Sequence, residues 1–553
     1  MTDASDLQAG LLSRLRVARR IRLGHAGALA VLGFAAVATL GVLLRPALPI
    51  DETRYLAVAW EMWTRGDWLV PTKNFALYAH KPPLLFWTMN LVWSLTGLSE
   101  IAARLVGPGF ALLCLLLTGR LASRLWPERA GIGADATLAL VGMLAFTLYG
   151  GLTMFDAALA AAVVSGMLAL LRAIRVGRAR DWALLGMALA LGGLAKGPVI
   201  LIHVGPVLAL APLWAGERVS WRAMARGVGI AVSTGLLLVA LWVVPAVIAG
   251  GAEYREAILW TQSGGRVADA VVHARPWWFL AALLPALLFP WIAVPAFWRT
   301  VAGADWRDPG LRLCLVWGGV ALVLFSLISG KQAHYLIPEL PAAALVVARL
   351  SPGRFALRGP VLVVAAGALA GIILASGLVP LGRAEALLQP RAAALAACLL
   401  PLGACLAALC LRGLAGGAVL TLGTVLSLNL LVGVTATRSI YDTHRIAAAV
   451  ASFDAAGIAF YGQSYHAEFT FAGRLTRPVA TPDTALALAA WEADHPAGVI
   501  VARLDRDHEY TEHAVREIQH LLLGWELLGE ARRQVFVDAF TKYVNLYLAH
   551  MRL

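Results

Sequence analysis

The stretch AGALAVLGFAAVATLGVLL, residues 26–44, contains no charged residue. About 20 apolar residues are needed for a helix to cross the hydrocarbon core of a bilayer, so this run is long enough to span one. A signal peptide would have a shorter apolar region and a small-residue cleavage site. Here the run leads instead into Arg45, Pro46 and the acidic pair Asp51 and Glu52. We therefore expect an uncleaved anchor behind a basic cytoplasmic tail, residues 1–25.

Similar apolar runs fill most of the remaining chain. Of its 553 residues, 60% are hydrophobic and 14% are charged, and the mean hydropathy is +0.74. Soluble domains are about 45–50% apolar and about 25% charged, so a soluble enzyme is excluded. We expect a polytopic α-helical membrane protein with about thirteen transmembrane helices. The further runs lie near 104–123, 134–152, 156–173, 181–195, 197–213, 227–249, 276–297, 311–328, 336–350, 359–379, 391–411 and 416–436.

The formal net charge is +13, and its distribution argues against nucleic-acid binding. The arginines cluster in short connections, and counting spans puts these connections on the side of the N-terminal tail, as the positive-inside rule requires. Residues 82–98 are apolar, but a span there would invert every later connection. We expect them to lie along the membrane surface. The clusters are Arg120/Arg124/Arg129, Arg172/Arg175/Arg178/Arg180, Arg218/Arg222/Arg226, Arg299/Arg307/Arg312, Arg349/Arg354/Arg358 and Arg412.

The span count also predicts the domain organisation. The transmembrane domain would cover residues 26–438, with periplasmic loops at 45–103 and 250–275. After Arg438, short apolar runs alternate with turn residues and charged helical stretches, which predicts a soluble periplasmic α/β domain over 439–553. The five cysteines lie in or beside apolar runs without CxxC spacing, so neither a disulfide framework nor a cysteine zinc site is predicted.

The predicted outer face carries the unusual polar residues. Asp51, Glu52 and Arg54 follow the first span directly, where acids can bind a reacting group or simply cap a helix. His80 and Lys81 precede two prolines that fix the backbone. A lysine there suits an anionic headgroup, and interfacial snorkelling is the alternative.

Three further outer junctions carry charged or aromatic side chains. Asp156 lies next to hydrocarbon at the outer junction of the third and fourth spans. An acid there is costly and indicates a functional site, unless it caps the fourth span. Lys196 lies in a Gly-Pro hairpin, and Lys331 precedes His334 and Tyr335. Because basic residues are disfavoured on this face, we expect an anionic ligand.

The loop 250–275 adds possible phosphate and metal ligands. Arg266 could bind a phosphate bidentately or contact lipid headgroups. Asp51, His80 and His273 could hold a divalent metal, zinc or magnesium, although no two of them share a helix at ligand spacing.

Five motifs together resemble the GT-C lipid-linked glycosyltransferases, and among these most closely the bacterial aminoarabinose transferases. The resemblance covers residues 1 to about 438 and is specific only in combination. Some members have Glu where this chain has His80. The motifs are the acidic pair at Asp51, His-Lys-Pro-Pro-Leu from His80, Met-x-Asp at Asp156, Leu-x-Lys-Gly-Pro at Lys196 and Lys-x-x-x-Tyr-x-x-Pro at Lys331.

The resemblance implies transfer of 4-amino-4-deoxy-L-arabinose from undecaprenyl phosphate to a phosphate of lipid A at the periplasmic face of the bacterial inner membrane. Such lipid A modification is associated with polymyxin resistance, and the anomeric centre would be inverted. Asp51, Asp156 and Lys81 would form the catalytic group. Substrate contacts would come from Arg54, Lys196, Arg266, Lys331 and Tyr335.

Two rival functions remain. Protein O-mannosyltransferases share the general plan and would need Asp51 as a base toward a hydroxyl acceptor. A transporter would place polar groups near the membrane midplane and often show repeated halves. Here they gather at one face, and no internal repeat is evident.

Overall fold

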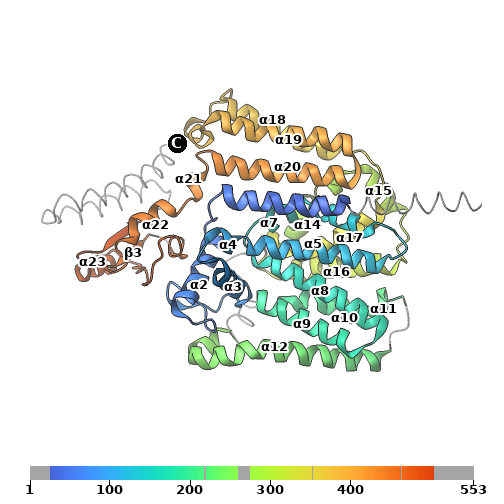
Figure 1. Cartoon of the computed structure of the whole chain (residues 1–553), viewed down its shortest axis with the longest axis horizontal. Helices are drawn as coiled ribbons and strands as arrows, with labels where there is room; N and C mark the ends of the chain where they lie inside the picture. Colours follow the sequence, from blue (N-terminus) through green and yellow to red (C-terminus); the bar gives the residue numbers. More distant parts are fainter. Residues whose placement is uncertain (1–24, 217–219, 259–273, 352, 463, 503–553) are drawn as a thin grey trace, which may run out of the picture. The chain divides into compact units, whose positions relative to one another are not determined.

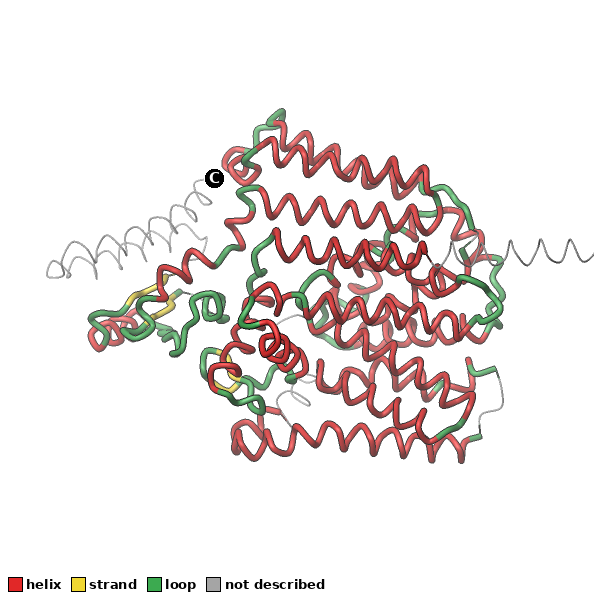
Figure 2. Tube along the Cα trace, viewed as in Figure 1, coloured by secondary structure: helices red, strands yellow, loops and turns green. Residues whose placement is uncertain are grey.

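The computed structural model describes residues 25–216, 220–258, 274–351, 353–462 and 464–502. The chain divides into two compact units. The first unit comprises Met1–Arg45, Ala79–Ile372 and Leu395–Leu431, and the second comprises Pro46–Tyr78, Ile373–Ala394 and Val432–Leu553. Figure 2 shows that the described part is mostly helical.

Long apolar helices confirm the multi-pass membrane fold. Among the described residues, nine helices are long and apolar enough to cross a membrane, or up to ten if one bent pair is a single span. The bent pair is α6 (Ile132–Val141) and α7 (Leu144–Gly150), which meet at 75°. The nine are His25–Leu44, Glu100–Leu125 (α4, Glu100–Arg104, with α5, Val106–Leu125), α8 (Phe155–Val176), Ala179–Ala209 (α9, Ala179–Lys196, with η1, Gly197–Val199, and α10, Ile200–Ala209), α12 (Trp221–Glu256), α16 (Pro309–Leu327), α18 (Arg358–Ser376), α19 (Arg391–Leu411) and α20 (Gly413–Val434).

Several of the thirteen predicted runs form helices that are shorter than predicted or that continue into the next helix, so fewer than thirteen single long helices occur among the described residues. The run 276–297 breaks into α14 (Phe279–Leu287), η4 (Trp291–Ala293) and α15 (Pro295–Ala302). Proline lacks the amide hydrogen that continues a helix, and this run contains four prolines. The run 336–350 becomes η5 (Ala333–Glu339) and α17 (Leu340–Leu350), and 197–213 ends in α11 (Ala211–Trp214).

The helix predicted to lie on the membrane surface is α3 (Leu84–Thr96), with 13 residues. At about 1.5 Å per residue it is roughly 20 Å long, too short for a core of about 30 Å. α3 is therefore not a span, as expected.

α12 shows how the first unit meets lipid. Leu237, Leu241 and Ile248 are 63%, 66% and 76% exposed, although α12 packs against α9 (Figure 1). A soluble protein rarely exposes such a continuous apolar surface, but a membrane helix requires it.

The arginine-rich connections of the first unit lie together. Arg349 pairs with Asp308 at 2.9 Å, and Arg129 donates a hydrogen bond to the Arg349 carbonyl. Arg175 donates to the Arg124 carbonyl at 2.9 Å. Connections from four parts of the chain thus share one end of the unit, as the span count predicted.

The second unit contains the short strands and joins two distant parts of the chain. Trp60 on α2 (Asp51–Arg65) donates to the Leu475 carbonyl at 2.8 Å, and Ala57 shares a core with Val450 and Phe460. The segment after the first span therefore folds with the C-terminal segment. The other elements are the antiparallel β1 (Thr72–Lys73) and β2 (Ala76–Leu77), the parallel β3 (Ile458–Tyr461) and β4 (Val499–Ala502), η6 (Gly382–Leu388), α21 (Arg438–Tyr441), α22 (His444–Ala451) and α23 (Ala485–Asp494).

The described part of the predicted domain 439–553 thus mixes helices with a two-stranded parallel sheet. Residues 503–553 lie outside the described residues.

Candidate functional site

Asp156 and Lys196 form the centre of the candidate site in the first unit. Asp156 lies in the first turn of α8 and Lys196 in the last turn of α9, and these two helices pack against each other. The Lys196 Nζ is 2.6 Å from the Asp156 Oδ1, and the side chains are 12% and 4% exposed. Such a buried pair is stable only where each charge is compensated.

The segment η5 brings Tyr335 and His334 next to the Asp156–Lys196 pair. The Lys196 Nζ lies 4.9 Å from the centroid of the Tyr335 ring, within the range of a cation–π contact. The His334 ring lies 5.1 Å from that of Tyr335. His334 also interacts electrostatically with Asp156.

Lys81 is the second cation beside Asp156. Its Nζ lies 5.6 Å from the centroid of Phe155, the residue before Asp156, and its charge acts on that carboxylate. Phe86 on α3 packs edge-on against Phe155, with ring centroids 5.4 Å apart. The Pro-Pro step and α3 therefore place Lys81 next to the start of α8. We call Lys81, Asp156, Lys196, His334 and Tyr335 the Asp156 cluster.

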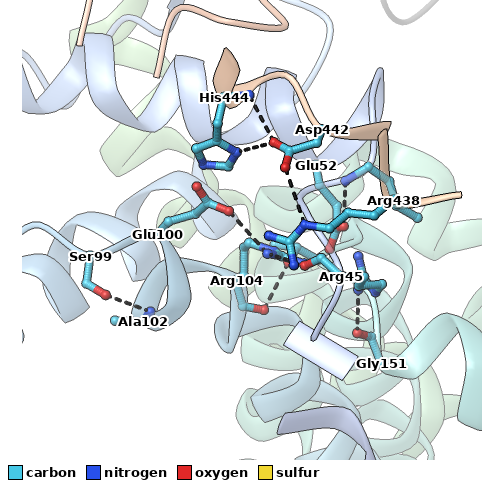
Figure 3. Close-up of polar contacts among 12 residues, drawn as sticks. Arg45, Glu52, Ser99, Glu100, Ala102, Arg104, Gly151, Arg438, Asp442 and His444 are labelled. Carbon is cyan, nitrogen blue, oxygen red and sulfur yellow. Dashed lines mark hydrogen bonds and ion pairs between the residues drawn. The ribbon is translucent and has the colours of Figure 1, made fainter. Parts of the chain in front are cut away.

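Buried arginines support the chain just before Asp156 (Figure 3). Arg45 donates to the Gly151 carbonyl at 3.1 Å, and Arg104 donates to the Arg45 carbonyl at 3.1 Å. The Thr153 hydroxyl in turn donates to the Arg104 carbonyl at 2.9 Å. These bonds fix the non-helical segment from which α8 begins.

The Asp156 cluster lies far from the arginine-rich end. α8 separates Asp156 from Arg175 by about 19 residues, or roughly 30 Å at the helical rise. The cluster and the basic connections thus lie at opposite ends of a membrane-spanning helix.

The charges of the cluster favour an anion. Two lysines adjoin one carboxylate, which leaves one formal positive charge when His334 is neutral. A positive charge beside apolar residues is costly unless an anion compensates it. The cluster therefore suits a phosphate, which two ammonium groups and a tyrosine can hold from different sides.

Asp51 and Arg54 form an ion pair on α2 in the second unit. The Tyr55 hydroxyl donates to Asp51 at 3.0 Å. Burial lowers the pKa of the Arg54 guanidinium, but the nearby Tyr78, Tyr55 and Asp51 outweigh it and hold that pKa above its usual value. Neither tyrosine stands out in the sequence, because tyrosine is common at membrane interfaces. The catalytic role of Asp51 stays a prediction.

The ammonium group of Lys331 is held by a hydrogen bond to the backbone. The side chain is buried, and Nζ donates to the Arg275 carbonyl at 2.9 Å, beside a backbone bridge between Ala274 and Gly330. This contact ties the start of η5 to the chain before α14. A substrate contact for Lys331 stays a prediction.

The remaining predicted ligands cannot be placed together. Arg266 and His273 lie outside the described residues, and His80 is exposed. Across the described ranges, no three His, Cys, Asp or Glu side chains form a metal-binding group. The prediction of zinc or magnesium at Asp51, His80 and His273 stays a prediction.

The chain is similar in sequence to known glycosyltransferases. The family model of dolichyl-phosphate-mannose-protein mannosyltransferases matches residues 80–248. The undecaprenyl phosphate-alpha-4-amino-4-deoxy-L-arabinose arabinosyl transferase of Pseudomonas aeruginosa is 32% identical over 56% of this chain and 57% of its own. That of Pectobacterium carotovorum is 30% identical over 54% of each. The chain thus spans somewhat more than half the length of these relatives.

A solved structure extends the likeness to most of the fold. ArnT from Cupriavidus metallidurans bound to undecaprenyl phosphate superposes with a TM-score of 0.67 at 20% identity, covering 86% of this chain and 89% of that one. The chain has this fold, and the predicted resemblance to lipid-linked glycosyltransferases is confirmed.

Proposed function

We propose that this protein is a lipid-linked glycosyltransferase that moves 4-amino-4-deoxy-L-arabinose from undecaprenyl phosphate to a phosphate of lipid A. One observation carries the proposal: Lys81, Asp156, Lys196 and Tyr335, far apart in sequence, meet at one end of a membrane helix. The relatives that resemble this chain in sequence are named for the same sugar and the same lipid carrier.

The site would act mainly on the leaving phosphate. When the bond between the sugar and the lipid phosphate breaks, negative charge grows on the phosphate oxygens. Lys81 and Lys196 would stabilise that charge in a poorly hydrated place, where fixed donors are most effective. Asp156 holds the Lys196 ammonium at 2.6 Å and so orients it before the lipid arrives.

A phosphate acceptor makes a general base unnecessary. Its second pKa is near 6, by analogy with phosphorylated side chains, so it is largely ionised at neutral pH. Attack from the face opposite the leaving phosphate would invert the anomeric centre. Asp51 would then bind the cationic amine of the sugar instead of removing a proton.

The distribution of the arginines supports a periplasmic location for the site. Because arginine-rich connections favour the cytoplasm, the opposite end of the first unit would face the periplasm in the bacterial inner membrane. The Asp156 cluster lies at that opposite end. The long prenyl chain of the donor would remain in the bilayer.

Protein O-mannosylation is the second candidate, because the family model over residues 80–248 carries that name. Incubating the purified protein with lipid-linked aminoarabinose and lipid A, and weighing the products, separates the two. A mass gain of one aminopentose on lipid A supports our proposal. No gain on lipid A, with transfer of mannose from a polyprenyl phosphate to a Ser- or Thr-containing peptide, would replace it with the alternative.

A further inference from the structure

A buried pair of ionisable side chains, a histidine and a glutamate, lies inside the membrane part of the first unit. His203 on α10 and Glu339 at the end of η5 are 1% and 6% exposed, and the Nδ1 of His203 pairs with the Oε1 of Glu339. Among the described residues, the other polar atom of each side chain, His203 Nε2 and Glu339 Oε2, is buried and has no hydrogen-bond partner. An ionisable pair in such a place is costly and calls for a functional explanation.

The pair links the same two segments that the Asp156 cluster links. Lys196 lies seven residues before His203, and Tyr335 lies four residues before Glu339. The cation–π contact of Lys196 with Tyr335 and the hydrogen bond of His203 with Glu339 are therefore two cross-links between residues 196–203 and residues 335–339.

An aromatic contact connects the two cross-links. Phe325 on α16 is buried, and its ring lies 5.2 Å from that of His203 and 5.8 Å from that of Tyr335. Packed side chains of this kind have few alternative arrangements, so a shift of His203 would be felt at Tyr335.

Stability alone does not account for this pair. Replacing a buried ion pair with apolar residues of similar volume is often neutral or stabilising. The two unpartnered atoms make this pair less favourable still. What the pair does provide is a directional contact between η5 and α10.

We propose that His203 and Glu339 are positioning residues whose side-chain hydrogen bond fixes η5 against α10 and so holds Tyr335 over Lys196 for the lipid phosphate. This inference rests on the proposed function, because the phosphate is the ligand that the Asp156 cluster would bind. Neither residue touches the substrate in this account.

The decisive variant removes the pair without leaving a buried charge. In His203→Leu/Glu339→Leu we expect thermal stability close to wild type and faster hydrogen exchange in residues 333–339. We also expect roughly tenfold weaker binding of undecaprenyl phosphate, because small misplacements of binding groups cost that much or more. The single variant Glu339→Gln keeps an acceptor for the imidazole, so it should retain most of the wild-type affinity for undecaprenyl phosphate.

A matched control removes another ion pair from the same unit. Arg172 pairs with the buried Asp181 at 3.1 Å. This pair joins α8 and α9 at the ends that lie away from Asp156 and Lys196. Arg172→Leu/Asp181→Leu should leave both the exchange of residues 333–339 and lipid binding unchanged.

The outcomes separate this inference from the proposed function. Wild-type protein that does not bind undecaprenyl phosphate overturns the proposed function. Wild-type binding together with unchanged affinity in the His203/Glu339 double variant overturns the positioning role alone, whether or not exchange increases. Loss of affinity in the Arg172/Asp181 control would equally contradict a specific role for His203 and Glu339.

Discussion

The Lys196 ammonium lies 2.6 Å from the Asp156 carboxylate, although 40 positions separate the two residues. They meet because α8 begins where α9 ends, so neighbouring helices of opposite direction bring their ends together. The pair is nearly buried, and Lys81 and His334 also act on the carboxylate.

The first prediction concerns the stability of this pair. Lys196→Met removes the closest cation from Asp156 and should lower the free energy of unfolding by about 3 kcal/mol, the lower end for a broken buried pair, since other positive groups remain. Asp156→Asn/Lys196→Met should recover much of the loss. Thermal unfolding in detergent measures both, and a double variant no more stable than Lys196→Met would contradict the assigned coupling.

The second prediction concerns Lys81. Lys81→Ala should reduce transfer by about 100-fold or more, the usual effect of removing one donor to a developing oxyanion, while membrane insertion stays intact. Lys81→Arg keeps the positive charge and should retain part of the activity. Wild-type rates in purified Lys81→Ala would remove this residue from the site.

The third prediction concerns the segment before α8. A Cβ on Gly107 would lie 2.4 Å from the Leu152 carbonyl oxygen and 2.7 Å from the Thr153 Cα, both backbone atoms. Gly107→Ala should therefore push this segment aside, cost about 1–3 kcal/mol of stability and reduce transfer.

Gly109 supplies the control on the same helix, because a Cβ there meets nothing within 4 Å. Transfer rates and melting temperatures should be near wild type in Gly109→Ala. Equal rates in both alanine variants would show that the close approach at Gly107 does not position Asp156.

The fourth prediction distinguishes the acceptors through Asp51. With an ionised phosphate acceptor, Asp51→Asn should weaken selection for the amino sugar while transfer of a neutral pentose continues. With a hydroxyl acceptor, the same change should abolish transfer, because the base is lost. Competition between the two lipid-linked sugars measures this, and an unchanged preference would refute any role of Asp51 in sugar recognition.

The fifth prediction concerns acid stability of the second unit. Hydrogen bonds from His444 hold the pKa of the Asp442 carboxyl well below its usual value, although burial opposes them (Figure 3). A lowered folded-state pKa stabilises the fold above the unfolded value, and this contribution disappears as pH falls through the folded pKa.

Melting temperature should therefore fall from about pH 5 to about pH 2 more steeply in wild type than in Asp442→Asn. His444→Ala removes the imidazole contact with Asp442 but keeps the backbone N–H donor, and it should flatten the curve in part. Parallel curves in all three proteins would show that Asp442 is not linked to stability.

Much of the Asp156 cluster could be predicted from sequence. Apolar runs and arginine-rich connections are strong physical constraints, and counting them is enough to place Lys81, Asp156, Lys196 and Tyr335 on one face. The lengths of the individual helices were harder to predict, because prolines divide runs such as 276–297 into short helices.

Long-range pairings could not be predicted in the same way. Nothing in the local pattern indicates that Trp60 would bond to Leu475, 415 positions away, or that Lys331 would bind the Arg275 carbonyl. His203 and Glu339 did carry a usable sign, namely an ionisable residue inside an apolar run, but their pairing depends on the approach of α10 and η5.

The most direct test of the account is an experimental structure of this protein with undecaprenyl phosphate bound. We predict that the phosphate oxygens lie about 2.7–2.9 Å from the ammonium groups of Lys81 and Lys196, with Tyr335 beside them. A phosphate bound instead at the arginine-rich end near Arg349, or away from both lysines, would contradict the account.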